Sequence, residues 1–234
     1  MRLDRFLSNQ PRFSRAEVRL LLVAGRARVN TKIERNGLRD VREFDRIELD
    51  DELLQAGKAA RYLMLHKPAG VVSATRHPQH RTVIDLLDVA DKHELHLAGR
   101  LDINTTGLLL ITNDGQWSRQ LTLPQSHLPK SYLVTTAAPI TKAYIELFQR
   151  GIYFAKENLT TMPAQLELLD SHRARLILHE GRHHQVKRMF AQFDNQVLEL
   201  HREQIGSLTL ADLPCGHWRA LTVQELHALH QTLQ

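Results

Sequence analysis

The first 50 residues of the chain alternate between helical and extended hydrophobic patterns. Apolar positions within 3–7 and within 18–22 recur with helical spacing. A capping box at 14–17 opens the second of these helices. Residues 28–33 then have the pattern of a strand, a tight turn and a strand, and 46–50 alternate as a strand does. These patterns predict a small module of helices and strands.

The same alternation continues beyond a short linker at 55–60, which follows the acidic run 50–52 that we expect to close the module. Strands are predicted at 62–67, 71–73, 95–98, 108–112, 130–136, 164–169, 173–178, 197–200, 205–210 and 218–221. Helices are predicted at 82–87, 116–121, 141–149 and 185–193, and from a second capping box at 222–225. The chain is therefore predicted to be α+β, with domains at 1–59 and 60–234.

Composition places the chain among globular proteins with a sizeable core. Of its 234 residues, 42% are hydrophobic and 24% charged. Its apolar runs are too short to span a bilayer, and its N-terminus lacks the apolar core of a signal peptide. A single cysteine, Cys215, excludes an intrachain disulfide and fits the reducing cytoplasm. No apolar stripe is left over for a partner copy, so we expect a cytoplasmic monomer without membrane contact.

Positive charge is concentrated near the N-terminus. The chain carries a formal +5, but residues 1–39 hold ten Lys or Arg against three acids, a local net of +7. Arg15 and Arg19 are four positions apart on a predicted helix and share one face, and Arg28 follows on a strand. Such a ridge suits phosphates. The alternative is a solvated helix face.

Two polar segments stand out in the larger domain. The predicted strands 95–98 and 108–112 enclose a short loop that carries Asp102 close to Arg100. An aspartate there is commonly a turn former, but a loop held between two buried strands also fixes a reactive side chain rigidly. The second segment, 180–190, has the pattern of a glycine turn followed by a basic helix. Spacing alone favours a solvated basic face for it.

Several motifs of this domain resemble those of the pseudouridine synthases of the RsuA type. Residues 99–115 read G-R-L-D-I-N-T-T-G-L-L-L-I-T-N-D-G, which closely resembles the family signature. Residues 180–189 read E-G-R-H-H-Q-V-K-R-M and 130–132 read K-S-Y, which resemble two further family motifs. His66 precedes Lys67-Pro68 where the family usually has Asn. The resemblance implies a mixed, mainly antiparallel sheet flanked by helices, and conversion of uridine to pseudouridine in RNA.

The resemblance also implies roles for individual residues. Asp102 is the catalytic nucleophile, Tyr132 stacks under the target base, and Lys187 sets a cation against the carboxylate. The uridine has to leave its helical stack before it is reached, and Arg100 is expected to fill the gap or pair with a phosphate. The turn at Lys67 is expected to be mainly structural. Two further residues of the domain are counted as RNA-binding: Arg182 and Lys67.

The N-terminal module resembles the small RNA-binding module first named from a small-subunit ribosomal protein, the S-four module. The resemblance rests on R-L-D at 2–4, S-R at 14–15 and G-R-A-R-V-N at 25–30. Ala27 and Thr31 depart from the usual Val and turn Gly. The resemblance implies that the module binds RNA, and three arginines are its candidate contacts: Arg15, Arg19 and Arg28.

The segments 114–118 and 200–203 look most like the family member that acts on small-subunit (16S) ribosomal RNA. The expected partner is therefore ribosomal RNA or a pre-ribosomal small-subunit particle. Isomerisation needs no redox or group-carrier cofactor, so none is expected. Large-subunit RNA as the target, and a non-catalytic RNA-binding assembly factor, are the alternatives. A metal enzyme is prompted by 14 histidines, but 93–96 and 183–184 lack metal-site spacing, so no metal site is predicted.

Overall fold

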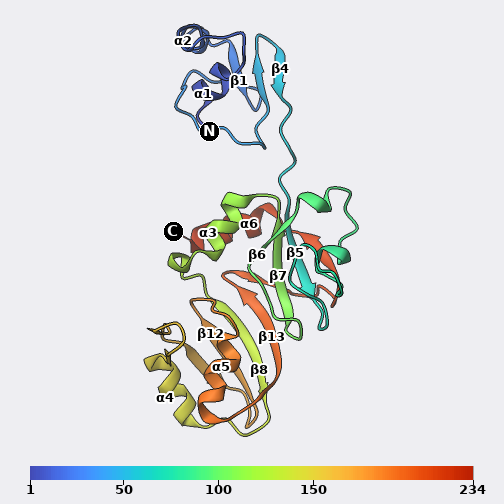
Figure 1. The fold of residues 1–234 in the computed structure, drawn as a ribbon, viewed down its shortest axis with the longest axis vertical. Helices are drawn as coiled ribbons and strands as arrows, with labels where there is room; N and C mark the ends of the chain where they lie inside the picture. Colours follow the sequence, from blue (N-terminus) through green and yellow to red (C-terminus); the bar gives the residue numbers. More distant parts are fainter. Residues whose placement is uncertain (234) are drawn as a thin grey trace. The chain divides into compact units, whose positions relative to one another are not determined.

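The computed structural model describes residues 1–233. The chain forms two compact units, residues 1–60 and residues from 61 onward (Figure 1). Nowhere in residues 1–233 does a helix have the length and apolar character needed to cross a membrane.

The first unit packs two helices on a four-stranded sheet. Its elements are α1 (Leu3–Ser8), α2 (Arg15–Val23), β1 (Ala27–Val29), β2 (Lys32–Ile33), β3 (Ile47–Leu49) and β4 (Glu52–Gln55). The strands are antiparallel in the order β2-β1-β3-β4. The predicted capping box is present, with the Ser14 hydroxyl accepting from the Glu17 amide and the Glu17 carboxylate accepting from the Ser14 amide. Leu7, Val18 and Ile47 are buried between helices and sheet.

Tight turns of left-handed backbone join the strands of this sheet. The predicted hairpin forms around Asn30 and Thr31, whose φ angles are 51° and 70°. Asn30 suits this region and uses its side chain to accept from the Arg46 amide at 2.9 Å. Asp50 and Asp51 form a second such turn, with φ of 51° and 64°. The expectation that the acidic run closes the module is therefore wrong, because the chain turns there and continues as β4.

One nine-stranded sheet dominates the second unit. Its strands are β5 (Tyr62–Lys67), β6 (His96–Ala98), β7 (Thr106–Thr112), β8 (Lys130–Thr136), β11 (Gln165–Leu168), β12 (Arg173–Leu178), β13 (Val197–Ile205), β14 (Leu208–Thr209) and β15 (Trp218–Ala220). The main order is β11-β12-β8-β13-β7-β5-β15, with β14 on β13 and β6 on β7. The β13–β7 pair is parallel and the other pairs are antiparallel.

Helices flank this sheet, which confirms the predicted α+β class. They are α3 (Gly115–Thr122), α4 (Lys142–Arg150), α5 (Gln185–Phe190) and α6 (Val223–Thr232). Single 3-10 turns lie at Ile84–Leu86, Lys92–Glu94, Pro124–Ser126 and Ala191–Phe193. A small hairpin of β9 (Tyr153–Phe154) and β10 (Leu159–Thr160) was not predicted.

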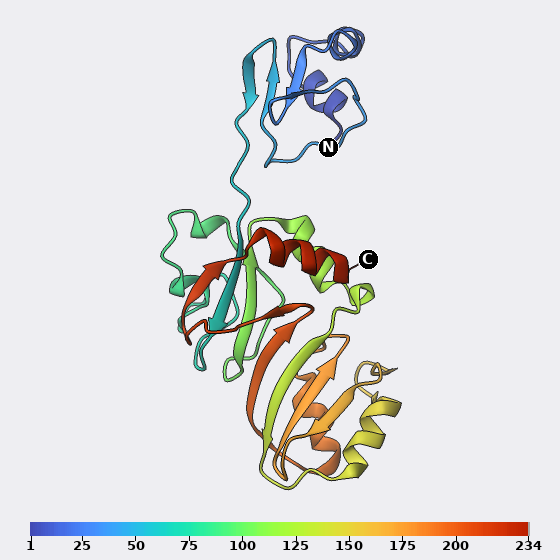
Figure 2. The same ribbon diagram turned by 180° about the vertical axis from the view of Figure 1, so that it is seen from behind.

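Different helices cover the two halves of the sheet, as Figures 1 and 2 show. Helices α4 and α5 cover the β11-β12-β8 half, where the rings of Phe148 and Phe190 meet at 5.3 Å. Helices α3 and α6 contribute Leu121 and Leu229 to a second core against β5 and β7. Both faces of β7 are buried, so its continuous apolar run 108–111 sends alternate side chains into two different clusters. The polar loop between β6 and β7 therefore leads directly into a buried strand.

Two strand predictions near this loop are wrong. Residues 71–73 form no strand and make only a single bridge, from Val72 to Thr82. Strand β13 runs without a break from 197 to 205, whereas its polar middle predicted an interruption. That middle is polar because Arg202 is buried there and donates from Nε to the Leu108 carbonyl oxygen at 2.8 Å. A buried polar side chain with a hydrogen-bond partner in the sheet therefore stands where an apolar residue of β13 was expected.

Candidate active site

A buried lysine, Lys67, holds the loop that carries Asp102 through hydrogen bonds to the backbone. The Lys67 ammonium donates to three carbonyl oxygens, those of Pro68 at 2.9 Å, Ile103 at 3.0 Å and Thr105 at 2.8 Å. Its side chain is 0% exposed, and burial lowers the pKa of Lys67 to about 8, while the charge of Asp102 opposes that shift. The expectation that Lys67 contacts RNA is therefore wrong, because its ammonium group is buried and donates its hydrogen bonds to backbone carbonyls inside the protein.

The segment after β5 holds the other end of the same loop. The Ser73 hydroxyl donates to the Leu101 carbonyl at 2.7 Å and accepts from the Leu101 amide at 3.1 Å. The Gly70 amide donates to the Ile103 carbonyl at 2.9 Å. Residues on both sides of Asp102 are thus fixed by hydrogen bonds, which restricts where its carboxylate can lie.

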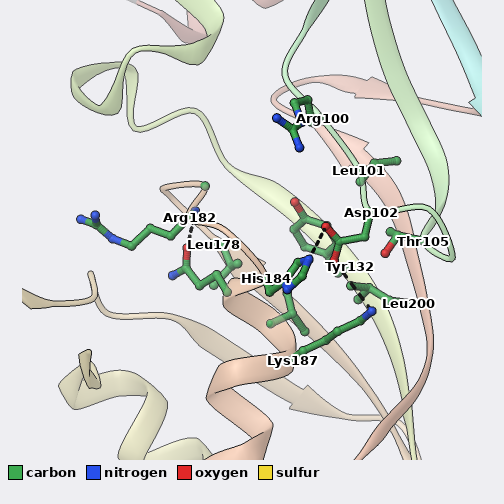
Figure 3. A pocket seen from close by; sticks show the side chains of 13 residues that line it. Arg100, Leu101, Asp102, Thr105, Tyr132, Leu178, Arg182, His184, Lys187 and Leu200 are labelled. Atoms are coloured by element: carbon green, nitrogen blue, oxygen red, sulfur yellow. Dashed lines mark hydrogen bonds and ion pairs between the residues drawn. The ribbon is translucent and has the colours of Figure 1, made fainter. Parts of the chain in front are cut away.

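The Asp102 carboxylate faces two basic side chains from one end of α5 (Figure 3). His184 Nε2 lies 3.4 Å from Oδ1, and Lys187 Nζ lies 3.8 Å from Oδ2. His184 immediately precedes α5 in left-handed backbone, with φ 52°, and Lys187 follows three residues later on the same helical face. The carboxylate keeps 28% of its surface exposed, so it is reachable from solvent.

Tyr132 completes the wall beside Asp102. It lies on β8 with 8% exposure and is directly opposite Arg202 on β13. Arg202 Nη1 is 3.5 Å from the Tyr132 hydroxyl, and the guanidinium carbon lies 6.0 Å from the centre of the ring. Arg202 itself is 3% exposed, and its Nη2 has no hydrogen-bond partner within the described residues. Tyr132 thus contacts Arg202 and also lines the cavity beside Asp102.

Two adjoining pockets meet at Asp102 and Tyr132. The inner one has an apolar lining from Leu101, Leu178, Val186 and Leu200. The outer one has a volume of about 420 Å³ and extends past the end of α3 to residues 179–184. That volume is in the range of small-molecule sites. Apolar side chains and the Asp102 carboxylate therefore border the same cavity as Tyr132.

Two further predicted residues line these pockets in different ways. Arg100 is exposed, borders both pockets, and forms no ion pair with any residue of the described chain. Arg182 donates from Nε to Glu180 at 2.8 Å, and in Figure 3 its side chain points away from Asp102. Glu180 also accepts from Gln185 Nε2 at 2.8 Å, so this acid organises the turn before α5. Arg100 is thus the more available cation.

The three arginines predicted in the first unit have different surroundings. Arg15 and Arg19 are exposed on α2 and line a groove that Arg5 of α1 also borders. Arg28 is paired with Asp51 at 3.0 Å, and the neighbouring Arg26 is bonded to Asp50. The acidic turn therefore neutralises part of the basic charge at β1. Arg15 and Arg19 on α2, in contrast, form no ion pair within residues 1–233.

Two side chains of the site were missed from the sequence. His184 was weighed only as a metal ligand, yet it faces Asp102, and Arg202 was not singled out at all. Among the other histidines that prompted a metal site, His96 bonds Ser118 at 2.8 Å. Groups of three His, Cys, Asp or Glu fit to hold a metal do not occur in residues 1–233. The adjacency of His184 to a basic helix was the signal available for its role.

Known proteins match this architecture along the whole chain. The family model described as RNA pseudouridylate synthase matches residues 61–192. The ribosomal small subunit pseudouridine synthase A of Pseudomonas aeruginosa is 56% identical over 97% of this chain and 99% of its own length. The protein of the same name from Escherichia coli is 44% identical over 97% and 98%. A solved pseudouridylate synthase has a TM-score of 0.71 at 39% identity, covering 98% of this chain and 99% of its own. The chain therefore belongs to the RNA pseudouridylate synthase family, in agreement with the enzyme class predicted from its motifs.

Proposed function

We propose that this protein converts one uridine of small-subunit (16S) ribosomal RNA into pseudouridine, with Asp102 as the group that attacks the nucleotide. One observation carries the proposal: the Asp102 carboxylate lies between His184 and Lys187 at the mouth of a pocket walled by Tyr132. The names of the 56% and 44% identical relatives support the small-subunit target.

The proposed chemistry needs an ionised carboxylate in a partly apolar site. Leu101 and Leu200 line the inner pocket with Asp102, and the Lys187 ammonium lies 3.8 Å from its carboxylate. The carboxylate is available there as a nucleophile or as a base toward the ribose. Detachment of the uracil leaves a free planar base, which the ring of Tyr132 holds by stacking.

Access to Asp102 requires the target uridine to leave its helix. Arg100 borders both pockets from an exposed position and is free of ion pairs in residues 1–233, which supports a contact with the RNA at the vacated position. Arg182 at the outer pocket is a second proposed contact, with its charge shared with Glu180.

We also propose that residues 1–60 form an RNA-binding domain of the S-four type. Arg15 and Arg19 on α2 would contact phosphates, with Arg28 contributing less because Asp51 already neutralises it. The proposed partner is ribosomal RNA or a pre-ribosomal small-subunit particle in the cytoplasm, with the protein acting as a monomer.

Pseudouridine mapping on ribosomal RNA tests the function. Cells with and without the gene are compared, and the deletion is complemented with the wild type or with Asp102→Asn. The proposal predicts that one small-subunit position loses its modification and that only the wild type restores it. Loss of a large-subunit position instead would overturn the target, and no change at any position would leave a non-catalytic binding factor.

A further inference from the structure

We propose that His184 carries the proton that the isomerisation moves within the uracil ring. The inference rests on the proposed function, since it concerns a step of the same reaction. In uridine, N1 is bonded to C1′ of the ribose and C5 carries a hydrogen. In pseudouridine, C5 is bonded to C1′ and N1 carries the hydrogen. The reaction therefore breaks C1′–N1, forms C1′–C5 and moves one proton from C5 to N1, with no electron gained or lost.

A group beside the detached base has to accept this proton and return it. Lys187 and Arg100 present only donors, so neither has a lone pair to accept it. The Asp102 carboxylate is already engaged with the nucleotide in the proposed reaction. The Tyr132 hydroxyl oxygen accepts from the buried Arg202 guanidinium, whose Nη1 lies 3.5 Å from it. An imidazole remains, and imidazole both accepts and donates a proton near neutral pH.

His184 occupies the position that this step requires. Its Nε2 is 3.4 Å from Asp102 Oδ1, and the residue lines both the inner and the outer pocket. The side chain is 46% exposed, so the ring is reachable by a base that turns over beside Asp102. His179 and His183 border the outer pocket but not the inner one, and within the described residues neither forms an ion pair with Asp102.

The surrounding turn fixes the ring in this place. The left-handed backbone at His184 is one that histidine and asparagine adopt more readily than most residues. The ring stacks on His183 with centres 3.8 Å apart. Gln185 ties the turn to Glu180 and accepts from the Arg182 amide at 3.0 Å. A proton carrier held this way needs no rearrangement between acceptance and return.

The test uses His184→Asn, because asparagine tolerates the left-handed backbone and keeps a polar group toward Asp102 but does not carry a proton. His127→Asn makes the same change at another histidine with left-handed backbone, φ 44°, which lines neither pocket beside Asp102. Single-turnover pseudouridine formation is measured on small-subunit ribosomal RNA transcribed with ordinary uridine or with uridine deuterated at C5, assembled with small-subunit ribosomal proteins. His184→Gly is assayed with and without free imidazole.

We expect His184→Asn to slow turnover about 100-fold, as loss of a general acid–base group does, with RNA affinity unchanged. Deuterium at C5 slows this variant more than the wild type, and imidazole partly restores His184→Gly. His127→Asn stays close to the wild-type rate. The inference is overturned if His184→Asn turns over at the wild-type rate, or if both His184 variants are slow without a deuterium effect or imidazole rescue. Absence of pseudouridine with the wild type itself would instead overturn the proposed function.

Discussion

Arg202 on β13 is the register partner of Tyr132 on the adjacent strand β8, and its Nη1 lies 3.5 Å from the tyrosine hydroxyl. The same guanidinium donates to the Leu108 carbonyl at 2.8 Å, so it joins β13 both to the wall of the pocket and to the strand that follows the Asp102 loop. This buried cation thus connects Tyr132 on β8 with strand β7, which follows the Asp102 loop. Its contact with Tyr132 is at the outer limit of a hydrogen bond, which makes it weak.

This geometry separates the two functions of Tyr132. Tyr132→Phe keeps the ring and removes the hydroxyl, so we expect turnover close to wild type and a loss of about 1 kcal/mol in unfolding free energy. Tyr132→Leu removes the stacking surface and should reduce turnover strongly. Urea unfolding and single-turnover assays measure the two effects. A stable but inactive Tyr132→Phe would show that the hydroxyl, rather than the ring, does the work.

Lys67 should control the stability of the site. Lys67→Met leaves three carbonyl oxygens without their donor, and we expect it to cost about 3 kcal/mol, since each unsatisfied buried group costs roughly 1–3 kcal/mol. Turnover should fall as well, because Ile103 and Thr105 beside the nucleophile lose their anchor. Chemical denaturation followed by assays of the folded fraction checks both. Wild-type stability in Lys67→Met would contradict the anchoring role.

The same lysine gives a pH dependence with a definite sign. Its pKa is about 8 when folded and 10.5 ordinarily, so between these values the unfolded chain holds more protons than the folded one. Folding stability contributed by this residue therefore rises as pH increases through that interval. Compared with Lys67→Met, the wild type should gain unfolding free energy from pH 8 to pH 10.5. Parallel curves for the two proteins would be inconsistent with this assignment.

Gly107 should tolerate no side chain. Its φ is 115°, and a Cβ there would lie 2.2 Å from the Arg202 carbonyl oxygen across the parallel β13–β7 pair. Gly107→Ala is expected to destabilise the protein by more than about 4 kcal/mol. Gly115→Ala is the matched control, since nothing lies within 4 Å of its added Cβ. Thermal unfolding of both variants provides the comparison, and equal melting temperatures would contradict the close packing of these strands.

Lys187 should affect chemistry more than binding. Lys187→Met removes the cation 3.8 Å from Asp102, and we expect kcat to fall about 100-fold, as for loss of one electrostatic contact at a reacting group. Arg188→Met removes a charge from the same helix, but that guanidinium pairs with Glu157 at 2.6 Å, so turnover should be retained. Steady-state kinetics of both variants distinguish the cases. Equal losses in the two would point to net charge alone.

Local signals predicted most elements, and longer-range contacts account for the failures. The capping boxes at Ser14 and Thr222 opened helices as predicted, because their bonds lie within four residues. The break predicted in β13 failed, since the partners of Arg202 lie on other strands and no local pattern reveals them. Lys67 was placed near RNA for the same reason, as its three acceptors come together only when β5 meets the β6–β7 loop. Asp102 and Lys187 came from motif resemblance rather than from periodicity.

The most direct test of the account is single-turnover pseudouridine formation by the purified wild type and by Asp102→Asn on small-subunit ribosomal RNA. Asparagine has the same size, and the backbone bond from the Thr105 amide to the residue 102 carbonyl, 3.0 Å in the wild type, does not depend on the carboxylate. Melting temperature and RNA affinity are measured beside the rate. We expect the wild type to modify one uridine, and Asp102→Asn to fold and bind RNA normally but to form no pseudouridine. Turnover by Asp102→Asn at the wild-type rate would contradict it.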